Sequence, residues 1–343
     1  MNILFFGLGS IGQRHLRNLK KIYPNFNIFA LRKKRKTPLL NSKNNKIKGT
    51  VEKKYKVNSI NNLNYLVKNN ILIDGAFICS PSSFHVKQCL WCIKKGIHFF
   101  SEKPVAVSIG NLMQINNQLK NKKIVNFVGY QLRFNPIIKY IKKNIFEKKI
   151  LGDVLFSNIY HGEHVDNFHS YESYKNSYTS KKKLGGGVIF TQIHELDYFR
   201  YFFEGYKIKK FNSFKSKISK LTIDVEDTYT TIFFLKKKKK KIFVNLTCSF
   251  LQVPKKREIF ISCSKGDLVA DLNSLEIKIR NKGGSIKLKK FSLDRNSMFE
   301  NEVRLFIEDI KKFKTSKKIS HKNQLPTVLD DFETNLLALK IKS

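Results

Sequence analysis

Three glycines near the N-terminus have the spacing of a phosphate-binding turn. Gly7, Gly9 and Gly12 form a GxGxxG pattern after the short apolar run Ile3–Phe6 and before a segment with helical periodicity. Such glycines allow a tight turn and let the backbone approach a pyrophosphate at the N-terminus of the following helix. The pattern predicts a dinucleotide site, with a tight turn that binds nothing as the alternative. The residues expected to contact the cofactor here are Gly7, Gly9, Ser10, Ile11 and Gly12.

Cationic residues follow the second apolar run, Asn27–Leu31. In NAD-binding proteins an acidic residue at this place binds the ribose 2′-hydroxyl, whereas the side chains of Arg32 and Lys33 suit a 2′-phosphate. The sequence therefore favours NADP over NAD as the cofactor. The alternative is that a Lys-rich composition places cations here by chance.

Two further loops with polar residues follow the predicted strands Gly75–Cys79 and His98–Ser101. Open α/β sheets bind their ligands at the carboxyl ends of parallel strands. Lys103 directly precedes Pro104, and a residue before proline is restricted to extended geometry, which would aim the ammonium group. The cofactor contacts expected in these loops are Ser80, Pro81, His85, Glu102 and Lys103.

The elements that must position these residues alternate between strand and helix up to about residue 128. Such alternation with short connections is typical of a parallel sheet with helices on both faces. After Gly152 the pattern changes to strand-like runs joined by turn residues, which predicts a mostly antiparallel sheet. These runs are Val154–Tyr160, Lys209–Phe214, Thr228–Leu235, Ile242–Phe250, Glu258–Cys263, Asp267–Asp271, Leu275–Ile279 and Ser285–Leu288.

Helices complete the predicted second half of the chain. One is expected at Ile193–Phe203, and two more, Glu300–Phe313 and Thr327–Ile341, close the sequence. We therefore expect an α/β Rossmann domain over residues 1–128 and an α+β domain with an open, mostly antiparallel sheet over 129–322. Residues 323–343 would form a C-terminal helix that can return to the first domain.

The 343 residues carry a formal net charge of +40, from 66 Lys and Arg against 26 Asp and Glu. Such a charge usually indicates a nucleic-acid or membrane-surface partner. However, the lysines are spread over the whole chain, and the abundant Lys, Asn, Ile, Phe and Tyr residues all have A- and T-rich codons. Base composition therefore explains the excess, and we expect no specific nucleic-acid partner. The run Lys236–Lys241 is interpreted as a solvated hairpin turn.

The five cysteines are scattered and odd in number, which indicates a reducing compartment and no disulfide framework. The N-terminus lacks a signal-peptide pattern, and no apolar run approaches the roughly 20 residues of a membrane span. We expect a cytoplasmic protein without a membrane partner.

Taken in order, the motifs resemble the Gfo/Idh/MocA family, the oxidoreductases grouped with glucose-fructose oxidoreductase and inositol dehydrogenase. The resemblance covers nearly the whole chain. It extends to members found with cell-surface carbohydrate biosynthesis over the segment from His164 to Gly187. It rests on GLGSIGQRH at Gly7–His15, AFICSPSSFH at Ala76–His85, SEKPVAVS at Ser101–Ser108, VGYQLRFNP at Val128–Pro136 and LGGGVIFTQIHELDYFRYFF at Leu184–Phe203.

The resemblance implies an NAD(P)-dependent oxidoreductase that transfers hydride between nicotinamide and a secondary alcohol or ketone of a sugar or sugar nucleotide. Lys103 would polarise the reacting oxygen, and His194 would act as general acid or base. The open sheet would carry substrate and oligomer contacts, so a homodimer or homotetramer is expected. Arg133 is expected to contact both cofactor and substrate. The further substrate contacts expected are Tyr130, His164, Tyr178, Lys182 and Thr191.

The sequence departs from the family pattern at Thr191, where an aspartate usually lies one turn before the catalytic histidine. Thr191 supplies a hydroxyl but no charge. Asp197, three residues after His194, is expected to compensate in part from the same helical face. The departure keeps open a non-catalytic nucleotide-binding scaffold or sensor. A second alternative is an NAD-retaining eliminase or glycosidase.

A group of polar residues raises the possibility of a metal site. The group is His161, Glu163, His164, Asp166 and His169. Its spacing is not the helical HExxH of a metalloprotease, and it follows a strand. We therefore expect a polar loop that faces the substrate and no metal.

Overall fold

The computed structural model describes residues 1–32, 37–168, 171–316 and 324–343, arranged around two sheets. The first sheet has the order β3-β2-β1-β4-β5-β6, and all its neighbouring strands run parallel. Its strands are nearly continuous buried apolar runs, because helices cover both faces. The strands are β1 (Asn2–Phe6), β2 (Asn27–Leu31), β3 (Val57–Ile60), β4 (Gly75–Ile78), β5 (His98–Ser101) and β6 (Asn126–Val128).

Helices connect these strands, as the alternating pattern predicted. They are α1 (Ser10–Ile22), α2 (Val51–Tyr55), α3 (Asn64–Lys68), α4 (His85–Lys95) and α5 (Ile109–Leu119). The sequence did not indicate β3, because Asn58 and Ser59 separate its two apolar residues, Val57 and Ile60.

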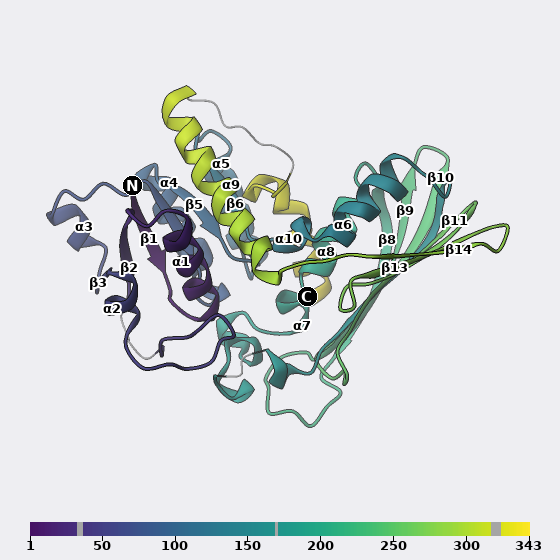
Figure 1. The fold of residues 1–343 in the computed structure, drawn as a ribbon, viewed down its shortest axis with the longest axis horizontal. Helices are drawn as coiled ribbons and strands as arrows, with labels where there is room; N and C mark the ends of the chain where they lie inside the picture. The colour runs from purple at the N-terminus through teal and green to yellow at the C-terminus, as the bar shows by residue number, and fades with distance from the viewer. Residues whose placement is uncertain (33–36, 169–170, 317–323) are drawn as a thin grey trace.

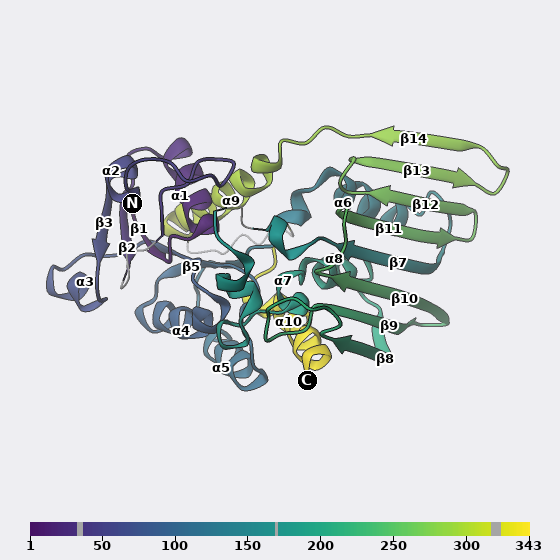
Figure 2. The same ribbon diagram turned by 90° about the horizontal axis from the view of Figure 1, so that it is seen from below.

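The second sheet has eight strands in the order β14-β13-β12-β11-β7-β10-β9-β8 (Figure 2). All its neighbours are antiparallel except β7 and β10, so the expectation of a mostly antiparallel sheet is confirmed. The lysine run forms the β9–β10 hairpin turn. The strands are β7 (Val154–Gly162), β8 (Lys207–Ser216), β9 (Thr228–Lys237), β10 (Lys240–Ser249), β11 (Lys256–Cys263), β12 (Gly266–Asp271), β13 (Glu276–Asn281) and β14 (Ile286–Lys290).

One face of the large sheet packs against helices, and this packing places α8 between the two sheets (Figure 1). Phe199 of α8 stacks on Phe233 of β9, with ring centroids 4.5 Å apart. The helices are α6 (Pro136–Tyr140), which continues as a π-helical turn, α7 (Val188–Thr191) and α8 (His194–Phe202). The helix expected at Ile193–Phe203 is confirmed as α8 to within one residue at each end. His194 is the first residue of α8, and a turn at Gln192 and Ile193 separates it from α7.

The last two helices, α9 (Arg295–Ser316) and α10 (Val328–Lys342), return from the large sheet toward the first one. In α9, Phe306 packs against Phe77 of β4, with ring centroids 5.3 Å apart. In α10, the Asn335 side chain bonds both the backbone N–H and the carbonyl of Ala106. Both helices thus pack against the first domain, although they follow its last strand by more than a hundred residues.

Candidate active site

The glycine-rich loop lies between the end of β1 and the start of α1. Gly7 has φ +91°, and a Cβ on Gly12 would lie 2.4 Å from the Gly7 carbonyl oxygen. These two positions therefore require glycine. A Cβ on Gly9, by contrast, would meet nothing within 4 Å, so the backbone borders open space there.

The N-terminus of α1 fits a dinucleotide phosphate. Gly9 is its N-cap and offers no side-chain hydrogen bond, and the first turn has no acidic residue. Unpaired N–H groups and the helix dipole favour an anion at such an end. Gln13 holds the loop in place, because its side chain bonds the Leu8 carbonyl at 3.0 Å and the Pro38 carbonyl at 2.8 Å. The sequence did not indicate Gln13, although it directly follows the glycine motif.

The cation at the end of β2 is already paired. The Arg32 guanidinium is 7% exposed and lies 2.8 Å from a Glu52 carboxylate oxygen. Ser59 donates a second hydrogen bond to the same oxygen of Glu52. The charge of Arg32 is therefore neutralised by Glu52. Lys33, the other expected contact, lies outside the described residues.

Lys103 lies at the end of β5, and its ammonium group crosses to the second domain. The Nζ atom donates to the Thr191 carbonyl oxygen at 2.7 Å, and the side chain is largely buried. Burial lowers the pKa of Lys103 below its ordinary value, while Glu102 and Glu195 act against this effect. Two of the three ammonium hydrogens remain available for another acceptor.

His194 lies three residues after the carbonyl that Lys103 binds. It is 7% exposed, and its Nδ1 atom has no hydrogen-bond partner among the described residues. Burial lowers the pKa of His194 well below 6.5, and Lys103 and Arg257 add to this effect. The structure therefore brings the two expected catalytic residues together and keeps the imidazole neutral at pH 7.

Asp197 does not assist His194, and the compensation expected from it is wrong. Its carboxylate accepts two hydrogen bonds from Arg133 Nε, at 3.0 and 3.1 Å, and one from the Arg133 NH2 group at 2.7 Å. The Asp197 carboxylate therefore points toward Arg133. Arg133 is thus held by Asp197, although it was expected to contact cofactor and substrate.

Tyr130 is fully buried between His194 and α10. Its ring meets the His194 ring edge-on at 5.7 Å, and its hydroxyl donates to Asp331 at 2.8 Å. The hydroxyl that was expected to bind substrate is therefore engaged within the protein. Its contact supports the position of the His194 ring.

A buried ion network lies beneath His194. Arg257 of β11 donates from Nε to Glu195 at 2.8 Å, and the His161 Nδ1 atom lies 3.0 Å from the same carboxylate oxygen. Glu163 is 3.7 Å from His161 and 2.8 Å from Lys255. The sequence did not indicate this network, because its members lie on α8 and on or beside the separate strands β7 and β11, although Glu195 directly follows His194.

The remaining expected contacts lie in the turns around Lys103 and in the segment before the glycine run. Glu102 Oε1 is 2.7 Å from His15 Nε2, and the Ser80 hydroxyl donates to Gln88. Tyr178 lies near Glu102, and burial raises its pKa. Lys182 is exposed beside Lys342. His164 lies 3.6 Å from Asp166 in a short helical turn.

The polar residues considered as metal ligands divide into separate groups. His161 lies between two glutamates, His164 pairs with Asp166, and His169 is outside the described residues. Within the part of the chain that the structure describes, no group of three or more His, Cys, Asp or Glu side chains could hold a metal ion. None of the helices in the described part of the chain has the length and apolar character of a membrane span.

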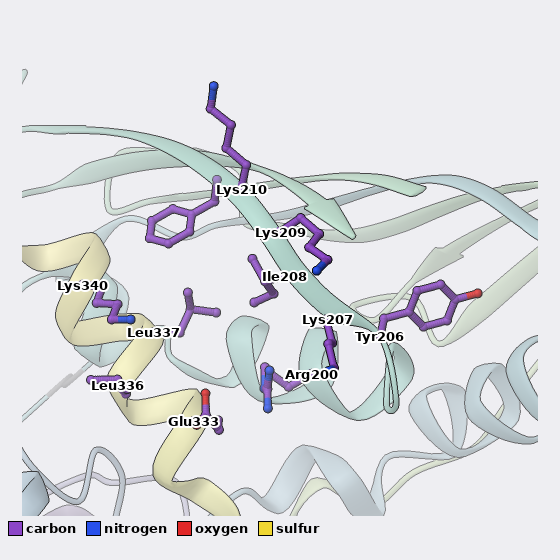
Figure 3. Close-up of a pocket in the computed structure, with 11 residues that line it drawn as sticks. Arg200, Tyr206, Lys207, Ile208, Lys209, Lys210, Glu333, Leu336, Leu337 and Lys340 are labelled. Carbon is purple, nitrogen blue, oxygen red and sulfur yellow. The ribbon is translucent and has the colours of Figure 1, made fainter. Parts of the chain in front are cut away.

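A cavity of about 720 Å³ lies away from these residues, between β8 and α10 (Figure 3). Its lining includes Arg200, Lys207, Lys209, Lys210 and Lys340 but neither Lys103 nor His194. β8 is an edge strand of the large sheet, and lysines on an edge hinder pairing with another sheet. The cations here therefore have a structural explanation.

The parallel sheet with its open glycine loop and the adjoining antiparallel domain are the fold of an NAD-binding oxidoreductase of two domains. Residues 1–130 match the family described as "Oxidoreductase family, NAD-binding Rossmann fold", and residues 142–269 match the GFO/IDH/MocA C-terminal domain. The chain belongs to the Gfo/Idh/MocA family, as its motifs predicted.

Curated relatives match about half of this chain or less. Myo-inositol 2-dehydrogenase of Thermotoga maritima is 28% identical over 145 residues, which is 42% of this chain and 40% of that protein. Glucose-6-phosphate 3-dehydrogenase of Bacillus subtilis is 24% identical over 187 residues, 53% of this chain and 52% of that protein. The chain thus matches about half or less of the length of these relatives.

Solved structures match over both domains. A levoglucosan dehydrogenase in complex with NADH superposes with a TM-score of 0.77 at 15% identity, covering 99% of this chain and 95% of the other. A UDP-N-acetylglucosamine 3-dehydrogenase from Acidithiobacillus ferrooxidans gives a TM-score of 0.72 at 15% identity, with coverage of 100% and 96%. At this identity the likeness establishes the fold.

Proposed function

We propose that the protein oxidises a secondary hydroxyl of a sugar or sugar nucleotide, or reduces the corresponding ketone, with a nicotinamide dinucleotide as cofactor. The observation that carries the proposal is the meeting of Lys103 and His194 across the two domains, through the 2.7 Å bond from Lys103 to Thr191. Relatives that act on inositol and sugars, and solved neighbours named as sugar or sugar-nucleotide dehydrogenases, support this substrate class.

The residues divide the work by their charge and protonation. When bound, the cofactor supplies the hydride acceptor or donor, and the α1 N-terminus at Gly9 and Ser10 would hold its pyrophosphate. A free N–H of the Lys103 ammonium would bind the reacting oxygen and stabilise negative charge on it. The neutral His194 ring would take the hydroxyl proton in oxidation and return it in reduction.

Preference between NAD and NADP stays a prediction. The expectation of NADP depended on a free cation at the end of β2, and Arg32 is ion-paired with Glu52. A 2′-phosphate would have to draw Arg32 away from that carboxylate. An acidic partner beside the ribose favours NAD for the same electrostatic reason.

Cofactor binding is tested by a fluorescence titration with NADH and NADPH at high salt, which removes nonspecific attraction to the net charge of +40. Gly9→Val should abolish saturable binding, since its side chain fills open space without a clash in the protein. Gly110→Val is the matched control, because a Cβ at Gly110 also meets nothing within 4 Å but lies in α5. Absence of saturable binding by the wild-type protein would refute the proposal.

Turnover is tested with myo-inositol, glucose 6-phosphate, levoglucosan and UDP-N-acetylglucosamine, by the absorbance of reduced nicotinamide. For a substrate that reacts, Lys103→Met and His194→Asn should each lower kcat by about 10²- to 10⁴-fold and leave NADH affinity within a few fold. Product without net change in nicotinamide would indicate the retained-cofactor eliminase instead. Binding without any turnover would favour the scaffold or sensor.

A further inference from the structure

His85 joins two turns that border the proposed active site. It is the first residue of α4 and is 1% exposed. Its Nδ1 atom lies 2.8 Å from the Pro104 carbonyl oxygen, and its Nε2 atom lies 2.7 Å from the Ser80 carbonyl oxygen. One ring therefore contacts the turn after β4 and the turn after β5 at the same time.

Both partners of the ring are carbonyl oxygens, which can only accept hydrogen bonds. A ring with a proton on each nitrogen donates to both turns, and a ring with one proton donates to one of them. In either state both nitrogens face carbonyl oxygens of the protein within 2.8 Å, and the ring is buried, so neither nitrogen can reach a cofactor. The role expected for His85 as a cofactor contact therefore has no available atom.

The Pro104 turn is the one that carries Lys103. The carbonyl that His85 contacts belongs to Pro104, the residue directly after Lys103, so the ring holds the Pro104–Val105 peptide, one peptide beyond the residue that carries the ammonium group. The other nitrogen of the ring contacts the Ser80 turn. Two residues of α4 bind this turn: His85 through the Ser80 carbonyl, and Gln88 through a 2.7 Å bond from the Ser80 hydroxyl. The Ser80 turn is thus held firmly to α4. His85 links this turn to the Pro104 carbonyl and so restrains the position of Lys103.

We propose that His85 is a positioning residue, which holds the Lys103–Pro104 turn against the Ser80 turn and thereby aims the Lys103 ammonium at the reacting oxygen. The inference depends on the proposed function for its catalytic consequence. Small errors in the position of a catalytic group have large effects, because an error of about 1 Å can cost 10²-fold in rate.

Two variants separate hydrogen bonding from space filling. His85→Leu fills much of the ring volume without a donor, and His85→Gln keeps an N–H donor. For a substrate that the wild-type protein turns over, His85→Leu should lower kcat by about 10- to 100-fold with NADH affinity within twofold, and His85→Gln should recover part of that loss. A fall in NADH affinity with kcat unchanged would overturn the proposal and restore a cofactor role.

A buried histidine at the opposite end of β5 serves as the control. His98 is 8% exposed, and its Nδ1 atom accepts from the Val125 N–H at 3.0 Å. His98→Leu should lower stability but leave the kcat of the folded enzyme unchanged. An equal loss of kcat in His98→Leu and His85→Leu would show a general effect of destabilisation and overturn the proposal.

Amide hydrogen exchange, which needs no substrate, tests the positioning role of His85 independently of the proposed reaction. Amide hydrogen exchange should rise over residues 102–107 in His85→Leu, stay at the wild-type level in His98→Leu, and fall back in His85→Gln. If exchange follows this pattern but no sugar is turned over, the positioning of the turn stands and the proposed function fails. Unchanged exchange over residues 102–107 in His85→Leu contradicts the positioning role whatever the activity.

Discussion

Thr191 takes the position at which the motif of the family usually has an aspartate, and this difference leaves His194, the proposed catalytic histidine, without a charged partner on that side. The Thr191 Oγ1 atom and the His194 Nδ1 atom are both buried without a hydrogen-bond partner among the described residues. Among the described residues, neither of the two carboxylates on α8 replaces the missing one, because Asp197 pairs with Arg133 and Glu195 pairs with Arg257. The imidazole is therefore more easily kept neutral than it would be beside an aspartate.

Restoring the carboxylate should change the pH dependence in a definite direction. Oxidation needs neutral His194, and burial keeps its pKa well below 6.5, so kcat/KM should stay level down to acidic pH. Thr191→Asp places a negative charge beside the ring and raises its pKa, so the acidic fall of kcat/KM should move up by about one pH unit or more. Thr191→Asn is the neutral control, and a similar shift in both variants would contradict this explanation.

Cofactor preference is a second prediction at this scale. Glu52→Gln removes a carboxylate near the expected 2′-phosphate and frees Arg32. The ratio of the Kd values should change by about tenfold in favour of NADPH over NADH, equivalent to about 1.4 kcal/mol. Ser59→Ala removes the other hydrogen bond to Glu52 without changing charge, and the ratio should stay constant. An unchanged ratio in Glu52→Gln would mean that the ribose lies elsewhere.

Elements such as α8 derive their stability from partners that are distant in the sequence. The start of α8 is fixed by Glu195, which is 0% exposed and bound by Arg257 from β11. Although burial acts in the opposite direction, Arg257 and His161 hold the pKa of Glu195 far below its ordinary value. This carboxylate therefore stabilises the fold above about pH 4.5, and its contribution is lost as the pH falls below that value.

Glu195→Gln should lower the free energy of unfolding at pH 7 by about 3–5 kcal/mol, because it leaves the buried Arg257 charge unpaired. The measurement is urea unfolding followed by circular dichroism. Glu300→Gln is the matched control, since Glu300 pairs with the mostly exposed Lys21 and such a pair contributes about 1 kcal/mol or less. Equal effects of the two substitutions would show that burial of the pair is unimportant.

An element can be predicted from the sequence when its signal is local, and a contact between distant residues cannot. The strands of both sheets were predicted because apolar runs and turn residues are local signals, and β3 failed because it has two apolar residues only. Lys103 and His194 were predicted as site residues because motifs mark them, and their roles stay a prediction. The Glu195–Arg257 pair could not be found, since 62 positions separate its members and only the strand order of the folded sheet brings them together.

The whole molecule exposes one face of its large sheet. Helices cover the face that includes Phe233, whereas Phe243 and Ile232 are 53% and 52% exposed, and Phe243 lies opposite the partly exposed Phe156 in the next strand. Apolar side chains also reach the solvent at the sheet edges, at Phe214 and Leu288. Exposed apolar side chains gathered on one face of a sheet are typical of a surface that binds a partner.

We predict that a second copy of the chain covers this face. Phe243→Asp should convert an oligomer to a monomer, as measured by light scattering after gel filtration, because a buried unpaired carboxylate is costly. Leu72→Asp is the control, since Leu72 is 83% exposed and follows α3 in the first domain. A wild-type protein that is already monomeric would contradict the prediction.

The return of α9 to the first sheet has a consequence for the order in which the protein folds. Ile310 lies against Gly75, and Phe306 packs on Phe77, so residues near the end of the chain complete the core of the first domain. Domains of many proteins fold during synthesis as each emerges from the ribosome. Here all eight strands of the large sheet are synthesised before α9, and until α9 emerges one side of the nucleotide-binding domain lacks its cover.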